Sequence, residues 1–279
     1  MGTVICDRGS RKIARIDDLD QPLHRIFPLW RFEEVLRLRQ LTLVKPAMWV
    51  DPREDLCSKF FLEPELGAGF AKPGQQLADY LSESWAQCWS YEADSDVLLR
   101  AYSRVVLDPI AKRNSTPAEE GIRVTTTARR LLLAMRQWAS KYRELHFYLV
   151  GVAYEPEENF GRHLASRLGS EGPRYFSTPD GRAESLCMKR QRFSHENEVR
   201  LLCIGNEGLG EGADIRRFEI DPCSLLTEIA FDPRLVSFER LEREQWIRSK
   251  GYTGSIKEDA SYMGVLTTIP MPCEWPDPK

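Results

Sequence analysis

The stretch GIRVTTTARRLLLAMRQWA, residues 121–139, decides the fold class of this chain. Its opening, Ile122-Arg-Val124, predicts a strand, and the three threonines at 125–127 predict the turn that follows it. From Ala128 onward, apolar side chains recur at helical spacing, which predicts an amphipathic helix packed against a sheet. A strand that leads directly into such a helix indicates a protein of mixed helix and sheet.

Apolar patterns on both sides of this unit predict further strands and helices. Two of the expected strands, 198–204 and 216–220, are joined by a glycine-rich turn and are expected to form a hairpin. Strands are expected at 27–32, 41–44, 84–89, 147–154, 198–204, 216–220 and 227–231, and helices after residue 32 and at 96–103, 160–168, 185–192 and 239–250. The sum is an α+β fold, a single domain with a mixed, mostly antiparallel sheet flanked by helices.

The ends of the chain differ in pattern from its middle. Residues 1–22 are rich in charge and poor in apolar pattern, so we expect a loosely ordered leader. The single α+β domain is expected over 23–263. The four prolines after Met263 predict an extended C-terminal tail over 264–279.

Composition excludes several classes of protein. The chain has 279 residues, 42% of them hydrophobic and 29% charged, which is typical of a folded globular domain. Its longest apolar stretch, 147–154, is too short to cross a bilayer, so no membrane partner is expected. No secretory signal pattern opens the chain and no C-x-x-C pair occurs among its seven cysteines, which favours reduced thiols and a cytoplasmic location.

Common cofactor and metal motifs are missing from the sequence. No Gly-Lys dipeptide occurs, so the chain has no P-loop, and it has no H-E-x-x-H motif. Its four histidines are widely separated and form no zinc-ligand pattern. We therefore expect no metal site and no tightly bound cofactor.

The densest polar segment, KRQRFSHENEVR at 189–200, runs directly into an apolar strand. If Glu198 begins that strand, Glu196, Glu198 and Arg200 share one face, because side chains repeat every two residues. Neighbouring carboxylates push their pKa values apart and can act as acid and base. The alternative interpretation is a solvated edge strand with a surface ion pair.

Other polar residues at expected strand and helix ends extend this site into a polar cleft. Thr125 and Thr126 lie at a helix N-terminus, where they act only as caps or also bind an anion. The hypothesis is a cleft that binds a small phosphate-bearing ligand such as NAD. Its expected members are Arg31, Arg100, Tyr102, Thr125, Thr126, Glu196, Glu198 and Arg200.

The order of several short motifs resembles a family of bacterial proteins of unknown function, over roughly residues 27 to 262. The motifs are Leu29-Trp-Arg-Phe32, Asp51-Pro-Arg-Glu54, Trp89-Ser90, Leu99-Arg-Ala-Tyr102, Gly121-Ile-Arg-Val-Thr-Thr126, Tyr154, Lys189 with Phe193 and Glu196-Asn-Glu-Val-Arg200, and Ile220-Asp-Pro222 with Glu228-Ile-Ala-Phe-Asp-Pro233. This chain departs from the family pattern at two positions. The family usually has Asn where Val50 stands here, and it usually has Trp near the position of Leu99. The resemblance implies no activity.

An arginine on an early strand, a threonine triplet and a Glu-x-Glu motif also resemble the arginine-serine-glutamate class of ADP-ribosyltransferases. This resemblance implies that Arg31 contacts the NAD phosphates and that Thr125 and Thr126 support the pocket. It implies that Glu198 holds the nicotinamide ribose and that Glu196 activates the acceptor, with Glu196, Glu198 and Arg31 as catalytic residues. NAD would then be a substrate, the acceptor an unknown protein or nucleic acid, and the chain a bacterial toxin or an effector of phage defence. The triplet here begins with threonine in place of serine.

Two non-catalytic functions remain open at this point. In the first, the same arginines and glutamates form an ion-pair network in a module that binds a nucleotide, a peptide or a protein. In the second, the basic run 189–192 binds RNA with Phe193 as a stacking platform. The net charge of -3 argues against the second function.

Overall fold

The computed structural model describes residues 5–6, 11–62, 74–205, 214–259 and 261–262. The strands of its main sheet are β1 (Ile5–Cys6), β2 (Arg11–Ala14), β3 (Pro22–Pro28), β4 (Gln40–Val44), β7 (Ser84–Ser90), β8 (Gly121–Thr127), β9 (His146–Gly151), β12 (Glu198–Ile204), β13 (Ile215–Glu219), β14 (Glu228–Phe231) and β15 (Ser255–Lys257). Neighbours follow the order β1-β2-β9-β12-β7-β3-β8-β14-β15, with β4 paired to β7 and β13 to β4. The pairs β2·β9 and β14·β15 are parallel and the others antiparallel, which confirms the expected α+β class with a mixed, mostly antiparallel sheet.

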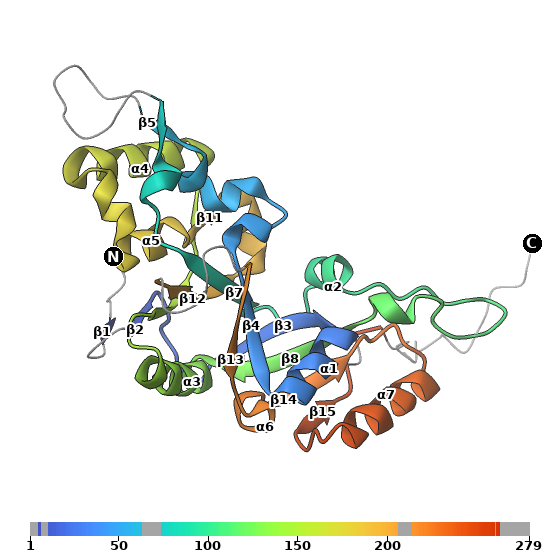
Figure 1. Cartoon of the computed structure of the whole chain (residues 1–279). Coiled ribbons are helices and arrows are strands. Elements are labelled where there is room, and N and C mark those ends of the chain that lie inside the picture. Colours follow the sequence, from blue (N-terminus) through green and yellow to red (C-terminus); the bar gives the residue numbers. More distant parts are fainter. Residues whose placement is uncertain (1–4, 7–10, 63–73, 206–213, 260, 263–279) are drawn as a thin grey trace, which may run out of the picture.

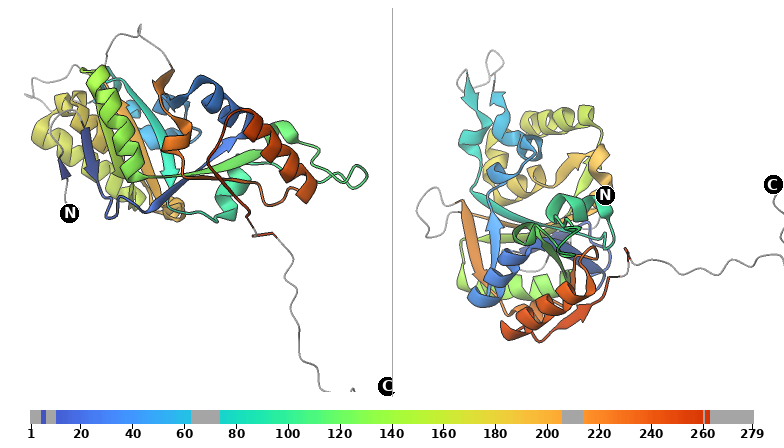
Figure 2. Two further views of the ribbon diagram at one scale, coloured as in Figure 1. Left: turned by 90° about the horizontal axis from the view of Figure 1, so that it is seen from below. Right: turned by 90° about the vertical axis from the view of Figure 1, so that its right-hand side faces the viewer.

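Helices cover both faces of this sheet. They are α1 (Leu29–Leu38), α2 (Asp96–Tyr102), α3 (Ala128–Lys141), α4 (Glu157–Glu171), α5 (Pro179–Ser185), α6 (Pro222–Leu225) and α7 (Ser237–Ser249), with the 3-10 turns η1 (Pro46–Met48), η2 (Pro52–Lys59), η3 (Leu77–Tyr80), η4 (Pro117–Glu119), η5 (Pro173–Ser177) and η6 (Gln191–Glu196). Helices α1, α3 and α7 lie on one side of the sheet and α4 and α5 on the other (Figure 1). Two further views show the same layers (Figure 2). Two small sheets, β10 (Ala153–Glu155) with β11 (Met188–Arg190) and β5 (Phe61–Leu62) with β6 (Gln75–Gln76), lie outside the main one.

Strand β12 shows how the core is divided between the two faces. Val199 and Leu201 belong to the larger hydrophobic core, which also holds buried residues of α1, α3 and α7. Leu202 and Ile204 belong to a smaller core on the other face. Because side chains alternate along a strand, the face that carries Leu202 and Ile204 also carries Glu198 and Arg200.

Several expected elements are confirmed with small changes in their bounds. They are the strands at 41–44 (β4), 84–89 (β7), 198–204 (β12) and 227–231 (β14) and the helices at 96–103 (α2), 160–168 (α4) and 239–250 (α7). The helix after residue 127 is α3, whose buried side chains include Leu131 and Met135. The expected turn at 125–127 is wrong, because these threonines belong to β8 and only Thr127 caps α3, accepting a hydrogen bond from the Arg130 amide at 3.3 Å.

The strand expected at 27–32 is wrong in its second half. Strand β3 ends at Pro28 and helix α1 begins at Leu29, so Arg31 lies on a helix. Phe32, Val35 and Leu36 are buried at i, i+3 and i+4 spacing. Burial of this helical face against the sheet stabilises the helix. The strand was expected from the aromatic residues alone, which also fit a buried helix.

Three other expectations about local structure are wrong. The helix expected at 185–192 is replaced by the end of α5, the strand β11 and the turn η6. The hairpin expected between 198–204 and 216–220 does not form, because β12 pairs with β7 and β9 while β13 pairs with β4. Because β12 lies between two strands, its backbone groups form hydrogen bonds on both sides. The order of strands along the sequence does not reveal this pairing. The strand expected over 147–154 is divided into β9 and β10 at Val152.

The expected leader, 1–22, contains a strand of the main sheet. Strand β2 pairs with β9 in parallel, and just after it the Arg15 Nε atom donates to the Gly151 carbonyl at 2.6 Å. Ile16 is part of the larger core. The main sheet therefore begins before residue 23, while the expected tail at 264–279 lies outside the described residues. In the described part of the chain, no helix combines the length and apolar character needed to span a lipid bilayer.

Candidate functional site

A pocket of about 850 Å³ lies where β3 and β7 diverge in the sheet. These two strands share one register pair, His24 opposite Ser90. Strand β12 pairs with the other edge of β7 and places Glu198 opposite the same Ser90. The register thus brings His24 and Glu198 to the two sides of Ser90, and all three residues line the pocket. Its volume is in the range of small-molecule sites.

Glu198 lines one end of the pocket, and its buried partner Arg200 lies outside the lining. The Arg200 Nε atom lies 2.8 Å from Glu198 Oε1, and its Nη2 atom lies 3.2 Å from Oε2. Arg200 also donates from Nη1 to the Leu186 carbonyl at 2.5 Å and from Nη2 to Glu54 Oε2 at 2.5 Å. The Trp49 ring lies over its guanidinium at 4.4 Å. Arg200 is 0% exposed, so it acts through the carboxylates that it holds.

Lys189 joins three carboxylates beside this pair. Its Nζ atom lies 2.6 Å from Glu196 Oε2, 3.2 Å from Glu198 Oε2 and 3.2 Å from Glu54 Oε1. Glu196 does not share the strand with Glu198 as expected, because it ends η6 and Asn197 follows in the left-handed region at φ 43°. The turn still brings Glu196 to Lys189, so Glu196 and Glu198 bind the same lysine although they do not share a strand.

The charges at this end of the pocket fix which groups are ionised. Burial by itself raises the pKa of Glu198, but the charge and hydrogen bonds of Arg200 and the charge of Lys189 lower it to about 2. Burial raises the pKa of Glu54 above its ordinary value despite Arg200 and Lys189. Glu198 is therefore a carboxylate at neutral pH. An ionised carboxylate can accept a hydroxyl proton in a hydrogen bond and can stabilise a developing positive charge.

Two arginines that the sequence analysis did not select also line the pocket, Arg25 on β3 and Arg123 on β8. Arg25 donates from Nη1 to the Cys88 carbonyl, and Arg123 donates from Nη1 to the Ala93 carbonyl at 2.6 Å. In the described part of the chain, the Nε atoms of both arginines are buried and have no hydrogen-bond partner. A signal was present in the sequence, since Arg123 stands inside a predicted strand between two apolar residues.

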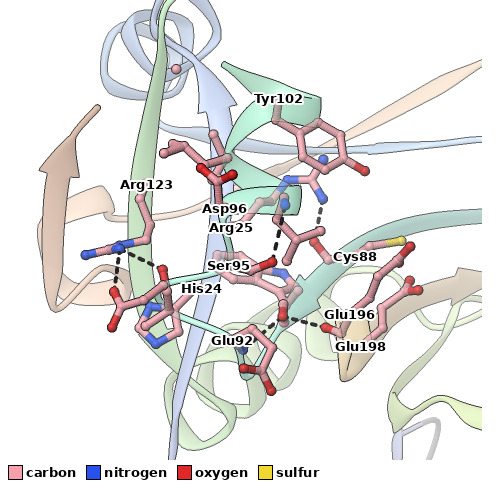
Figure 3. Close-up of a pocket in the computed structure, with 18 of the residues that line it drawn as sticks. His24, Arg25, Cys88, Glu92, Ser95, Asp96, Tyr102, Arg123, Glu196 and Glu198 are labelled. Atoms are coloured by element: carbon pink, nitrogen blue, oxygen red, sulfur yellow. Dashed lines mark hydrogen bonds and ion pairs between the residues drawn. The ribbon is translucent and has the colours of Figure 1, made fainter. Parts of the chain in front are cut away.

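Figure 3 shows how these groups are distributed around the pocket. Glu196 and Glu198 lie together on one side, and Arg123 lies on the opposite side (Figure 3). His24 contacts Thr125 through Nδ1 and Oγ1 at 3.1 Å. Burial and the charge of Arg123 lower the pKa of His24 to about 4, so this imidazole is neutral at neutral pH. Glu196 and Glu198 thus lie at one end of the pocket and Arg123 lies at the other, which we call the arginine end. Each end also holds a group of the opposite charge, Lys189 beside the glutamates and Asp259 beside Arg123.

Three of the expected site residues line the pocket and five do not. Those that line it are Glu196, Glu198 and Tyr102, and those outside its lining are Arg31, Arg100, Thr125, Thr126 and Arg200. Arg31 is ion-paired with Glu34 on α1 at 2.6 Å. Arg100 is ion-paired with Asp96 at 2.6 Å, and buried Thr126 donates to the Leu225 carbonyl at 2.7 Å. Helical placement of Arg31 and backbone bonding of Thr126 explain why these two side chains are directed elsewhere.

Metal ligands do not converge in the described residues. No group of three or more histidine, cysteine, aspartate or glutamate side chains is arranged there to hold an ion. Lys189 and Arg200 supply the positive charge between the carboxylates of the pocket.

Comparisons with known proteins give distant structural matches. No protein-family model matches the chain, and no curated protein gives a significant match. The sequence resemblance to a bacterial family therefore gains no support from these two comparisons. Matching solved structures include Thermus sp. 2.9 DarT in complex with ADP-ribosylated single-stranded DNA, at 12% identity and a TM-score of 0.34 over 88% of this chain and 97% of that one. The same protein in complex with carba-NAD+ matches at 13% identity and a TM-score of 0.31, over 86% of this chain and 95% of that one. Its complex with NAD+ matches at 12% identity and a TM-score of 0.32, over 86% of this chain and 96% of that one. TM-scores this low carry no inference about this chain.

Proposed function

We propose that this protein is an ADP-ribosyltransferase that takes NAD as its substrate. The observation that carries the proposal is the polarity of the pocket. One end holds Glu198 as an ionised carboxylate, and the lining also contains two arginines whose buried Nε groups have no partner among the residues that the structure describes. NAD has the complementary polarity, with a cationic nicotinamide ribose and an anionic pyrophosphate. The toxin or defence role suggested by the sequence belongs to this proposal.

The pocket residues divide between binding and chemistry. Arg25 takes the role that the resemblance to ADP-ribosyltransferases implies for Arg31, since Arg25 lines the pocket and Arg31 does not. Its fork of N–H donors suits a phosphate oxygen. Tyr102 on α2 lines the pocket and offers an aromatic face to a ring. Glu198 accepts the hydrogen bond of a ribose hydroxyl, because its charge is retained at neutral pH.

The proposed reaction breaks the bond between ribose C1′ and the nicotinamide nitrogen. The electron pair leaves with nicotinamide, which departs as a neutral molecule, and the ribose acquires an oxocarbenium-like charge that Glu198 stabilises. The acceptor nucleophile then forms a bond to C1′, and its proton passes to Glu196. Glu196 uses Oε2 to bind Lys189, and its side chain remains 20% exposed, so it can receive that proton from the pocket side.

The second candidate function is a non-catalytic module that binds a nucleotide or a protein. It is favoured by the pairing of Glu198 with two buried cations. Glu198 contacts Arg200 and Lys189 and is 5% exposed. In this function the network holds β12 against η2 and η6 and carries out no reaction. Structural ion-pair networks shift pKa values as active sites do.

Nicotinamide release from NAD distinguishes the two functions. The purified full chain is incubated with NAD, and Glu198→Gln, Arg25→Met and Arg31→Met are compared with it. We expect release that Glu198→Gln lowers by at least about 100-fold and Arg25→Met by about tenfold or more, with Arg31→Met as the unaffected control. Absence of both release and NAD binding in the folded chain would remove the transferase proposal and leave the binding module.

A further inference from the structure

The segment after β15 lies against two walls of the pocket. Strand β15 pairs with β14 at the edge of the sheet, and the chain then contributes Asp259, Ser261 and Tyr262 to the pocket lining. We call these three residues the C-terminal strap. Tyr262 binds α2, since its hydroxyl contacts Asp96 and accepts from Arg100 Nη2 at 3.0 Å.

Asp259 makes the second contact of the strap, on β8. Its Oδ2 atom lies 2.9 Å from Arg123 Nη1. The side chain of Asp259 is 8% exposed and that of Arg123 is 10% exposed, so this ion pair is largely removed from water. Burial by itself raises the pKa of Asp259, but hydrogen bonds from Ser261 and the charge of Arg123 lower it below its ordinary value. The strap therefore brings an anion to the arginine end of the pocket.

The pairing leaves part of the guanidinium unused. In the described residues, the contacts of Arg123 all run through Nη1, which meets the Ala93 carbonyl, Asp94 and Asp259. Its Nε atom is buried and has no partner within the described ranges of the chain. A buried N–H group without a partner costs free energy, and a guanidinium binds an oxyanion best through two parallel N–H groups. Asp259 is thus an incomplete ligand for Arg123.

We propose that Arg123 is an anion subsite of the pocket, that Asp259 occupies it in the free protein, and that a phosphate or pyrophosphate group of the ligand displaces the Asp259 carboxylate. A pyrophosphate carries more negative charge than one carboxylate and offers several oxygens to the Nε side of the guanidinium. Displacement moves the strap away from β8 and uncovers the pocket. The inference rests on the proposed function in taking the ligand to be a nucleotide, and the chemistry that it requires is a phosphate or pyrophosphate anion.

Binding of ADP and of inorganic pyrophosphate to the full chain tests this subsite without any reaction. Asp259→Asn removes the competing charge and keeps the shape of the side chain. We expect it to tighten ADP binding by about three- to tenfold in calorimetric titrations. Asp94→Asn is the matched control, because Asp94 contacts the same Nη1 atom at 3.2 Å but is 74% exposed and screened by water. We expect this control to change ADP affinity by less than about twofold.

A double-mutant cycle shows whether the effect passes through Arg123. Arg123→Lys keeps a positive charge in β8 but lacks the fork, and the gain from Asp259→Asn is expected to disappear in that background. Unchanged or weaker ADP binding by Asp259→Asn would overturn the inference, as would failure of both ADP and pyrophosphate to bind any variant. Circular dichroism of each variant confirms that it is folded.

Parallel assays with NAD separate this inference from the proposed function. If Asp259→Asn tightens ADP binding but no variant releases nicotinamide, the subsite stands and the transferase proposal fails. If the wild type releases nicotinamide and Asp259→Asn leaves both ADP affinity and the KM for NAD unchanged, the transferase proposal stands and the subsite fails.

Discussion

The Arg200 Nε atom lies 2.8 Å from Glu198 Oε1, and the two side chains share one face of β12 with one residue between them. Arg200 is fully buried, and its other N–H groups bind Glu54 and the Leu186 carbonyl. The pair explains how a carboxylate that is 5% exposed keeps its charge. The pair also couples the stability of the fold to the candidate site. Arg200 is part of the buried ion-pair network, and it also keeps Glu198 ionised in the pocket.

Replacement of Arg200 tests that coupling. Arg200→Met leaves Glu198 and Glu54 buried without their main counter-charge, and we expect the free energy of unfolding to fall by about 3–5 kcal/mol. Arg31→Met is the matched control, since it breaks a partly exposed i,i+3 pair with Glu34 and should cost less than about 0.5 kcal/mol. Urea denaturation measures both. Equal, small losses would mean that the buried pair adds no more than a surface pair.

The two pocket carboxylates should have separable effects on the proposed reaction. Glu198→Gln removes the charge that stabilises the oxocarbenium-like ribose. Nicotinamide release should therefore fall by at least about 100-fold, whichever acceptor, water included, takes the ADP-ribose. Glu196→Gln removes the base for the acceptor, so labelled ADP-ribose should no longer pass to macromolecules while hydrolysis of NAD persists. The assay follows free ADP-ribose and labelled macromolecules in parallel. Identical losses in both products for both variants would contradict the division of roles.

Acid should destabilise the protein in a window set partly by His24. Its pKa is about 4 in the folded protein, because burial and Arg123 disfavour the charged imidazole, whereas the unfolded value is near 6.5. Between these values the unfolded chain binds the proton and the folded chain does not, so the free energy of unfolding falls as the pH is lowered from about 6.5 to about 4. His24→Gln should flatten this part of the pH profile.

His195→Gln is the control for that measurement, since His195 is exposed on η6. Its profile should follow the wild type. Glu198 acts in a lower window, because its pKa is lowered to about 2 and the stability that it contributes is lost as the pH falls below about 4.5. A His24→Gln profile that matches the wild type above pH ~5 would show that His24 is not the titrating group.

The N-terminal segment should contribute to stability through the edge of the sheet. Arg15 donates to the Gly151 carbonyl at 2.6 Å and to the Cys187 carbonyl at 3.2 Å, directly after β2. Deletion of residues 1–15 removes these bonds and the pairing of β2 with β9, and we expect it to lower the free energy of unfolding by about 2–4 kcal/mol.

Gly151→Ala tests the same contact with the chain intact. A Cβ atom at Gly151 would lie 2.4 Å from the Arg15 carbonyl oxygen, so the segment must move away from β9. Gly161→Ala is the control, because a Cβ atom there meets nothing within 4 Å. Denaturant midpoints that are unchanged by both the deletion and Gly151→Ala would show that residues 11–15 are not held against β9 as the structure describes.

Local patterns in the sequence predicted most elements but only part of the site. The helix at α3 and the strand at β12 follow from the spacing of their apolar residues, and Glu198 was correctly expected at the start of its strand. Arg31 was placed on a strand because aromatic residues surround it, whereas burial of Phe32, Val35 and Leu36 makes this segment a helix. Because Arg31 was taken as the arginine of the early strand, Arg25 was not considered. Arg25 lies six positions earlier, on β3.

The sequence by itself determined the fold class, the strand that carries Glu198 and Arg200, and the helical spacing of α3, because each depends on side chains close together along the chain. Tertiary structure alone decided that β12 lies between β7 and β9, that Lys189 meets three carboxylates, and that Asp259 reaches Arg123 across 136 positions of sequence. The physical reason is that strand pairing and ion pairing join groups whose distance in the sequence carries no information about their distance in the fold. Only the burial of the whole sheet fixes which of those groups meet.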